Sequence, residues 1–177
     1  MPKIMKFITI FSFITTIIMS VLFLCFNKNI FLVFAITFGT TFYHLGIRLL
    51  IGFFYNSVMN NRADYTKKWY RVSPWETKLY ELLRVKKWKG RMPTYNPEDF
   101  SIKKHTLNEI AQVMCQSELV HETNIIFSFV PIIAYKLFGS FYVFLITSVC
   151  AAVFDLLFVI VQRYNRSRVV KLVLKKK

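Results

Sequence analysis

The chain has 177 residues, of which 55% are hydrophobic and 19 are Phe, and its mean hydropathy is +0.41. This apolar share exceeds that of an ordinary soluble domain, so the composition excludes that class and predicts an integral membrane protein. The 24 Lys and Arg residues outnumber the nine Asp and Glu residues and give a formal net charge of +15. Such an excess indicates contact with anionic groups.

The predicted fold is all-α, an integral membrane bundle of four transmembrane helices with a cytoplasmic loop that contains interfacial amphipathic helices. A bilayer core of about 30 Å needs about 20 apolar residues in a helix. The segments that meet this need are 7–26, 30–59, 123–138 and 141–161, the third being the shortest. The chain is therefore divided into 1–59, 60–122, 123–162 and a basic tail at 163–177.

The distribution of basic residues predicts the orientation. Twelve of the 24 Lys and Arg residues lie within 60–122, seven lie from Arg163 onward and two precede the first span, whereas the turns at 27–29 and 139–140 are nearly without charge. Basic loops stay in the cytoplasm, so both termini and the long loop are predicted there. No nucleic-acid-binding module accompanies the charge, which favours anionic lipids or a phosphate-bearing substrate over nucleic acid.

The sequence of the long loop predicts the start of two helices. Ser73 and Glu76 form a capping-box pattern with Pro at the first helical position, and they predict an interfacial helix. Thr106 and Glu109 form a second box. The helix that begins there should carry residues 117–122 and continue into the third span without a break.

The stretch SELVHE at 117–122 carries the candidate catalytic pair. Residues three or four apart share a helix face, so Glu118 is predicted to lie beside both His121 and Glu122. A histidine oriented by a carboxylate is suited to act as a general base, with Glu118 as the orienting partner. We expect His121 about one turn outside the hydrocarbon; the alternative is that these residues only form a polar collar at the end of a span.

Three polar side chains fall inside predicted spans. Asp155 stands in the middle of an apolar run, where a carboxylate is costly unless it is paired or faces a cavity. Arg48 and His44, four residues apart in the second span, are its expected partners. No metal site is predicted, because Cys25, Cys115 and Cys150 do not have the spacing of metal ligands. The three cysteines are predicted to be packing residues.

Basic and amide side chains near the predicted cytoplasmic face are candidates for substrate binding. Guanidinium groups form bidentate bonds with phosphate, and the amides add neutral hydrogen-bonding groups. The candidates are Lys87, Trp88, Lys89, Arg91, Gln162, Arg163, Asn165, Arg166 and Arg168. Trp88 is expected to hold the loop at the membrane interface.

Four stretches carry a family resemblance: WYR at 69–71, KKWKGRMP at 86–93, ELVH at 118–121 and QRYNRSR at 162–168. Together they resemble the glycosyl-4,4'-diaponeurosporenoate acyltransferase family of small bacterial membrane proteins, over about 45–173. The resemblance implies an enzyme of the bacterial cell membrane that moves a fatty acyl group onto a sugar hydroxyl of a carotenoid glycoside or another polyprenyl or glycerol glycolipid. Acyl-CoA, acyl carrier protein or phospholipid would be the donor, and no cofactor is implied.

Two other classes remain open on the sequence. One is a membrane methyltransferase of the isoprenylcysteine type, although its His-rich element and late acidic pair are not found here. The other is a non-catalytic lipid-binding membrane protein. The His-x4-Asp pattern of many acyltransferases is absent, since Ile110 lies five residues after His105 and Ile126 lies five after His121.

Overall fold

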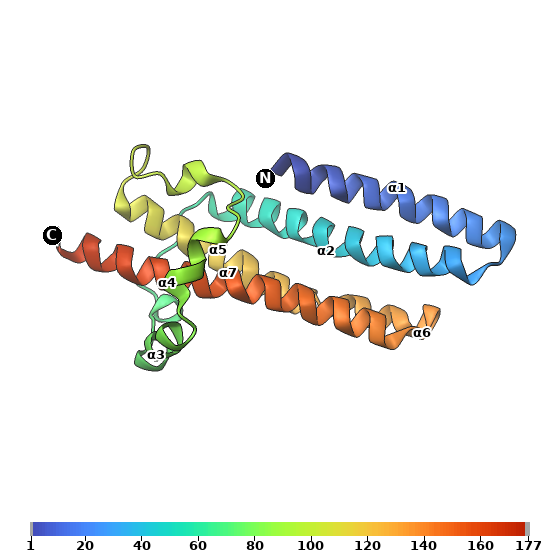
Figure 1. The fold of residues 1–177 in the computed structure, drawn as a ribbon. Helices are drawn as coiled ribbons and strands as arrows, with labels where there is room; N and C mark the ends of the chain where they lie inside the picture. The colour runs from blue at the N-terminus through green and yellow to red at the C-terminus, as the bar shows by residue number, and fades with distance from the viewer. Residues whose placement is uncertain (1, 176–177) are drawn as a thin grey trace.

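The computed structural model describes residues 2–175, and within them it contains helices and connecting segments but no strand. Two antiparallel helix pairs make up most of it (Figure 1). The first pair is α1 (Pro2–Phe26) with α2 (Asn29–Met59), and the second is α5 (Leu107–Phe127) with α7 (Phe141–Lys175). The all-α prediction is confirmed; Lys176 and Lys177 of the predicted basic tail lie outside the described residues.

Helices α1, α2 and α7 are long and apolar enough to cross a membrane. They contain the predicted spans 7–26, 30–59 and 141–161, and they leave large apolar side chains such as Phe7 and Phe53 on the outer surface, 68% and 72% exposed. A surface of this kind requires lipid around it. The chain is a multi-pass membrane protein.

The third predicted span is not one continuous helix, because Pro131 interrupts it. Helix α5 ends at Phe127 and is followed by the 3-10 helix η4 (Val130–Ala134) and the four-residue α6 (Tyr135–Phe138). Proline has no N–H to donate to the carbonyl four residues earlier, and its ring clashes with that carbonyl. Here that carbonyl is the one of Phe127, which accepts a hydrogen bond of 3.0 Å from the hydroxyl of Tyr43 instead.

Both predicted capping boxes are present. The Glu76 carboxylate accepts from the backbone N–H of Ser73 at 2.7 Å, and Glu109 does the same for Thr106 at 2.7 Å. The loop between α2 and α5 is otherwise folded as short helices: η1 (Lys68–Tyr70), α3 (Pro74–Leu82), α4 (Val85–Trp88), η2 (Lys89–Arg91) and η3 (Pro97–Phe100). Trp75 is 66% exposed, as expected for an interfacial helix.

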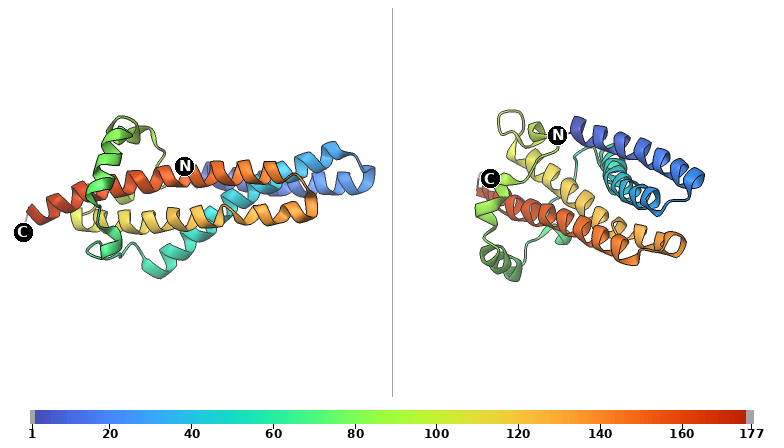
Figure 2. Two further views of the ribbon diagram at one scale, coloured as in Figure 1. Left: turned by 90° about the horizontal axis from the view of Figure 1, so that it is seen from below. Right: turned by 45° about the vertical axis from the view of Figure 1, so that its right-hand side comes forward.

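The loop packs onto the ends of α5 and α7 that lie away from the two tight turns. Figure 2 shows the short helices gathered at that end, with the turns after α1 and α6 at the opposite end. Buried Tyr70 and Cys115 pack the loop against α5, and Tyr80 and Val85 pack it against Val161 of α7. Cys115 is the packing residue that was predicted; Cys25 and Cys150 are instead exposed on the outer surface, because they lie on helix faces without a neighbour.

Candidate active site

His121 and Asp155 form a hydrogen-bonded pair between α5 and α7. Nδ1 of His121 lies 2.8 Å from Oδ1 of Asp155, and a carboxylate only accepts, so Nδ1 is the donor. The imidazole stacks on the ring of Phe158, with centroids 4.6 Å apart and planes 9° apart. The other ring nitrogen, Nε2, has no hydrogen-bond partner among residues 2–175, and the side chain is 19% exposed. The ring is therefore fixed on one side and accessible on the other.

Asp155 is fully buried and its second oxygen is paired with a cation. Nη2 of Arg48 donates to Oδ2 of Asp155 at 2.5 Å. The same guanidinium donates to the carbonyls of His44 at 2.6 Å and Ala151 at 3.1 Å, which holds it across α2 and α7. The Arg48–Asp155 pair considered from the sequence is therefore formed, while the imidazole of His44 contributes no hydrogen bond to it.

The pair lies deeper than the sequence analysis expected for His121. Asp155 precedes Arg163 by eight residues of a continuous helix, a distance of about 12 Å along the axis. His121 lies beside Asp155 and Phe158, within the apolar part of α7, and not one turn beyond it. The antiparallel packing of α5 on α7 causes this, because His121 continues inward past Glu118, which lies at the level of Arg163.

Glu118 does not contact the imidazole as expected. Its Oε1 accepts from Nη1 of Arg163 at 2.6 Å, its Oε2 accepts from Arg166, and both Glu118 and Arg166 are essentially without solvent exposure. Two arginines of α7 are stronger partners for a buried carboxylate than an imidazole one turn away. The orienting carboxylate at His121 is Asp155.

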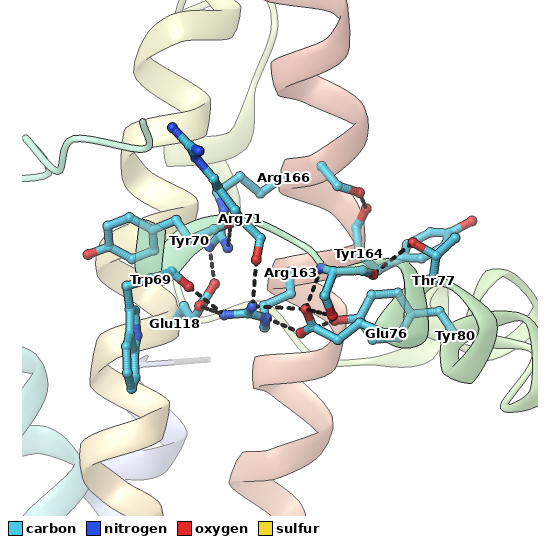
Figure 3. Close-up of polar contacts among 12 residues, drawn as sticks. Trp69, Tyr70, Arg71, Glu76, Thr77, Tyr80, Glu118, Arg163, Tyr164 and Arg166 are labelled. Carbon is cyan, nitrogen blue, oxygen red and sulfur yellow. Dashed lines mark hydrogen bonds and ion pairs between the residues drawn. The ribbon is translucent and has the colours of Figure 1, made fainter. Parts of the chain in front are cut away.

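Arg163 uses all five of its N–H donors within the protein (Figure 3). Besides the bond to Glu118, Nε and Nη2 donate to Glu76 at 2.7 and 3.2 Å, and the two terminal nitrogens donate to the carbonyls of Trp69 and Arg71 at 3.1 Å each. A guanidinium has five donors, so none remains for a phosphate group. The expectation that Arg163 binds phosphate is not met by this arrangement.

The same network also fixes the neighbouring loop. Arg166 donates to the carbonyl of Tyr70 at 2.7 Å, and its guanidinium lies 4.9 Å from the centre of that ring. Burial raises the pKa of Glu76, but hydrogen bonds from Arg163 and Ser73 outweigh burial and leave that pKa below its ordinary value. Burial raises the pKa of the Tyr80 hydroxyl, which donates to Glu76, to about 12. The carboxylates of Glu76 and Glu118 neutralise the guanidinium groups of Arg163 and Arg166, so these four side chains together carry no net charge.

A second set of cations has no carboxylate partner among residues 2–175. Nζ of Lys89 donates to the side-chain oxygen of Asn165 at 2.5 Å and lies 5.0 Å from the ring centre of Tyr164. Arg168 lies 5.6 Å from the same ring centre and donates to the Tyr164 hydroxyl at 3.0 Å. Lys89 and Arg168 are thus held at one aromatic ring, and no carboxylate among residues 2–175 neutralises their charge.

Among residues 2–175, the other predicted binding residues form no hydrogen bond or cation–π contact with Tyr164. Nε1 of Trp88 donates to the carbonyl of Leu83 at 3.0 Å, and its side chain packs against the cluster around Val161. Lys87 and Arg91 are exposed, and Gln162 is half-buried on α7. No group of three or more His, Cys, Asp or Glu side chains that could hold a metal ion occurs within residues 2–175.

Three residues at the two polar clusters were not predicted from the sequence. Asn124 points its side-chain amide at Asp155, at 3.5 Å; Phe158 supports the imidazole; and Glu76 neutralises Arg163. A signal for Phe158 was available in the sequence. His121 lies eighteen residues before Gly139 and Phe158 lies eighteen after Ser140, so two helices that fold back at this turn bring them opposite each other.

The stretches WYR, ELVH and QRYNRSR all meet in the network around Arg163 and Arg166, and KKWKGRMP reaches the same part of α7 through Lys89. A family model described as glycosyl-4,4'-diaponeurosporenoate acyltransferase, CrtO, matches residues 66–175. The chain belongs to this family. A search of curated proteins and a search of solved structures each found no match.

Membership of the CrtO family makes the chain an acyltransferase and implies a glycosyl carotenoid acceptor and an acyl donor. The matched part contains the loop, α5 and α7, and with them His121 and Asp155. Helices α1 and α2 lie outside it, although Arg48 of α2 completes the pair at Asp155.

Proposed function

We propose that this CrtO family member transfers a fatty acyl group onto a sugar hydroxyl of a glycosyl carotenoid or a related glycolipid, with His121 as the general base. The observation that supports this most directly is the fixed imidazole: Nδ1 is bonded to Asp155 at 2.8 Å while Nε2 has no partner among residues 2–175. A base in this state can accept the proton of a hydroxyl group.

The reaction follows from that geometry. The sugar hydroxyl oxygen attacks the acyl carbonyl carbon while Nε2 of His121 takes the hydroxyl proton. Asp155 stabilises the imidazolium that forms, so it is a positioning residue. When the tetrahedral intermediate collapses, the bond to the thiol or alcohol of the donor breaks, and Nε2 returns the proton to that leaving group.

Glu118, expected to act on the imidazole, is better assigned to holding the site together. Its ion pairs with Arg163 and Arg166 join α5 to α7 one turn from His121, and the arginines in turn hold the backbone of residues 69–71. In this assignment the network sets the depth of His121 relative to α7 and takes no part in proton transfer.

The donor head is assigned to the cations at Tyr164. Lys89 and Arg168 carry charge that no described carboxylate neutralises, which suits the phosphate of acyl-CoA, of an acyl carrier protein or of a phospholipid. Lys87 and Arg91 extend the basic surface, Trp88 holds it near the interface, and Gln162 and Asn165 add amide groups beside it.

We assign both termini and the loop to the cytoplasm of the bacterial cell, and we count the segment from Thr123 to Phe138 as a fourth crossing. Lys and Arg gather at the loop end of the molecule. Although the helix is broken at Pro131, η4 packs on α7 and the segment runs beside α7 to the turn at 139–140 (Figure 1). Irregular backbone at membrane depth is tolerated where it is packed against protein.

The experiment compares acyl transfer by purified protein with labelled acyl-CoA, labelled phospholipid or labelled acyl carrier protein and a glycosyl carotenoid acceptor. We expect His121→Ala to lower turnover at least 100-fold. The control is His105→Ala, a histidine that is 37% exposed and pairs only with Glu109. Full activity of folded His121→Ala would exclude the base, and label arriving only from S-adenosylmethionine would indicate a methyltransferase.

A further inference from the structure

A large apolar groove separates the two helix pairs at the end of the molecule away from the loop. Its volume is about 1100 Å³, and its lining residues come from α1 and α2 on one side and from η4, α6 and the start of α7 on the other. Figure 1 shows where these helices lie. Its walls include Leu24, Ala35, Gly39, Ala134, Leu137 and Phe144. The break at Pro131 contributes, because η4 supplies several of the wall residues.

The serine and threonine hydroxyl groups in the wall already donate within the protein. Thr16 donates to the carbonyl of Ser12 at 2.7 Å, Ser20 to that of Thr16 at 2.8 Å, and Thr40 to that of Ile36 at 2.9 Å. Each bond lies within the residue's own helix and leaves mainly methyl and methylene groups facing the groove. Apart from Lys136 of α6, at the end of the groove near Leu137, the wall is therefore mostly apolar and suits hydrocarbon.

The length of the groove fits one fatty acyl chain. Leu32 and Tyr43 both line it and are eleven residues apart on α2, which is about 16 Å. A hydrocarbon core of about 30 Å holds two layers of chains, so one chain extends about 15 Å. A groove of this length accommodates the chain of a single leaflet.

Unpartnered polar atoms lie just beyond the inner end of the groove. Thr40 and Phe144 line it, and one turn further along the same helix faces are His44 and Ser148, since residues four apart share a face. Both ring nitrogens of His44 and the hydroxyl of Ser148 are buried without a hydrogen-bond partner among residues 2–175. Buried polar groups rarely stay unpaired, so these atoms indicate a polar ligand atom at this level.

We propose that the groove binds the fatty acyl chain of the donor, with the methyl end toward Leu24 and Leu137 and the carbonyl end toward His44 and Ser148. The hydroxyl of Ser148 and one N–H of His44 can donate to a carbonyl oxygen. His44 also lies one turn from Arg48, so this orientation directs the carbonyl toward the Asp155 pair. The proposal rests on the acyl transfer proposed above.

Chain-length selectivity tests the groove. Ala134→Phe places a ring in the groove wall, and we expect kcat/KM for the longest acyl donors to fall about tenfold while short donors are unaffected, which corresponds to about two buried methylene groups. Val33→Phe is the matched control, because Val33 is 56% exposed and does not line the groove. An unchanged chain-length profile in folded Ala134→Phe protein would overturn the proposal.

Photocrosslinking gives a readout that does not depend on turnover. In vesicles of phosphatidylglycerol, a fatty acid ester with a diazirine at its methyl end should label Leu24 and Leu137, and one with the diazirine beside the carbonyl should label Tyr43. Labelling there should saturate, whereas labelling of Phe7 and Phe11 on the outer face of α1 should rise in proportion to the probe. The site is refuted if labelling of the groove residues rises in proportion to the probe, as at Phe7 and Phe11. It is also refuted if the methyl-end probe labels Tyr43 and the carbonyl-end probe labels Leu24 and Leu137. Saturable labelling without acyl transfer would refute only the enzymatic proposal.

Discussion

Replacing Asp155 by Asn separates two roles of one carboxylate. The amide has nearly the same shape, yet it removes the acceptor that fixes Nδ1 of His121 and the counter-charge of Arg48. The Asn amide can also donate a hydrogen bond to Nδ1 of His121. The imidazole can then adopt the tautomer in which Nε2 carries the proton. A protonated Nε2 cannot act as the base.

The expected losses of stability and of turnover can both be estimated from the geometry. Arg48 is 12% exposed and its other bonds go only to backbone carbonyls, so Asp155→Asn leaves a nearly buried charge uncompensated. Removing one partner of a buried ion pair costs about 3–5 kcal/mol of stability. Loss of a general base lowers turnover about 10²- to 10⁴-fold.

The variant Arg48→Gln/Asp155→Asn tells the two effects apart. It removes the uncompensated charge, so thermal unfolding in detergent should return most of the way to that of the unmodified protein. Turnover, measured by acyl transfer at saturating donor and acceptor, should stay as low as in Asp155→Asn. The reasoning is refuted if turnover recovers together with stability, since the carboxylate would then act only through folding.

Three further changes test other parts of the molecule. Tyr43→Phe leaves the Phe127 carbonyl without its bond and should cost about 1–3 kcal/mol, measured as a lower unfolding temperature with unchanged far-UV circular dichroism. Glu76→Gln should lower the unfolding temperature fully above the unfolded pKa of about 4.3 and progressively less as the pH falls below it. A carboxylate whose pKa is lowered by folding stabilises above its unfolded pKa and stops stabilising as the pH falls through its folded pKa. Lys89→Ala should raise KM for a phosphate-bearing donor severalfold, and the difference from the unmodified protein should shrink as salt is added.

Local features of the fold were predictable because their causes are local. An uncharged run of twenty residues determines the first helix, and the boxes at Ser73 and Thr106 mark where α3 and α5 begin. The break after Phe127 was not predicted, because the apolar composition of the segment suggested one span. Pro131 is the sequence signal for this break.

The residues of the candidate site and the Arg48–Asp155 pair were predicted from the sequence, but the carboxylate that bonds His121 was not. His121 and Asp155 each stood out by chemistry, but the nearest carboxylate in sequence was taken as the partner of the imidazole. Which carboxylate reaches it depends on how α5 lies along α7, and only a count from the turn at 139–140 carries that information. The partners of Arg163 come from three separate segments, and no spacing in the sequence connects them.

Asp155 and Arg163 belong to one unbroken helix, so the proposed reacting level and the proposed cytoplasmic boundary at Arg163 keep a constant separation of about 12 Å. The protein cannot shorten that separation when the bilayer changes. In a thinner bilayer the helix must tilt, or the lipid must deform around it, and a thicker bilayer draws the boundary residues inward at a cost for each ångström of mismatch. Membrane thickness, set by the chain length of the surrounding lipids, is therefore a variable to which this enzyme's rate should respond.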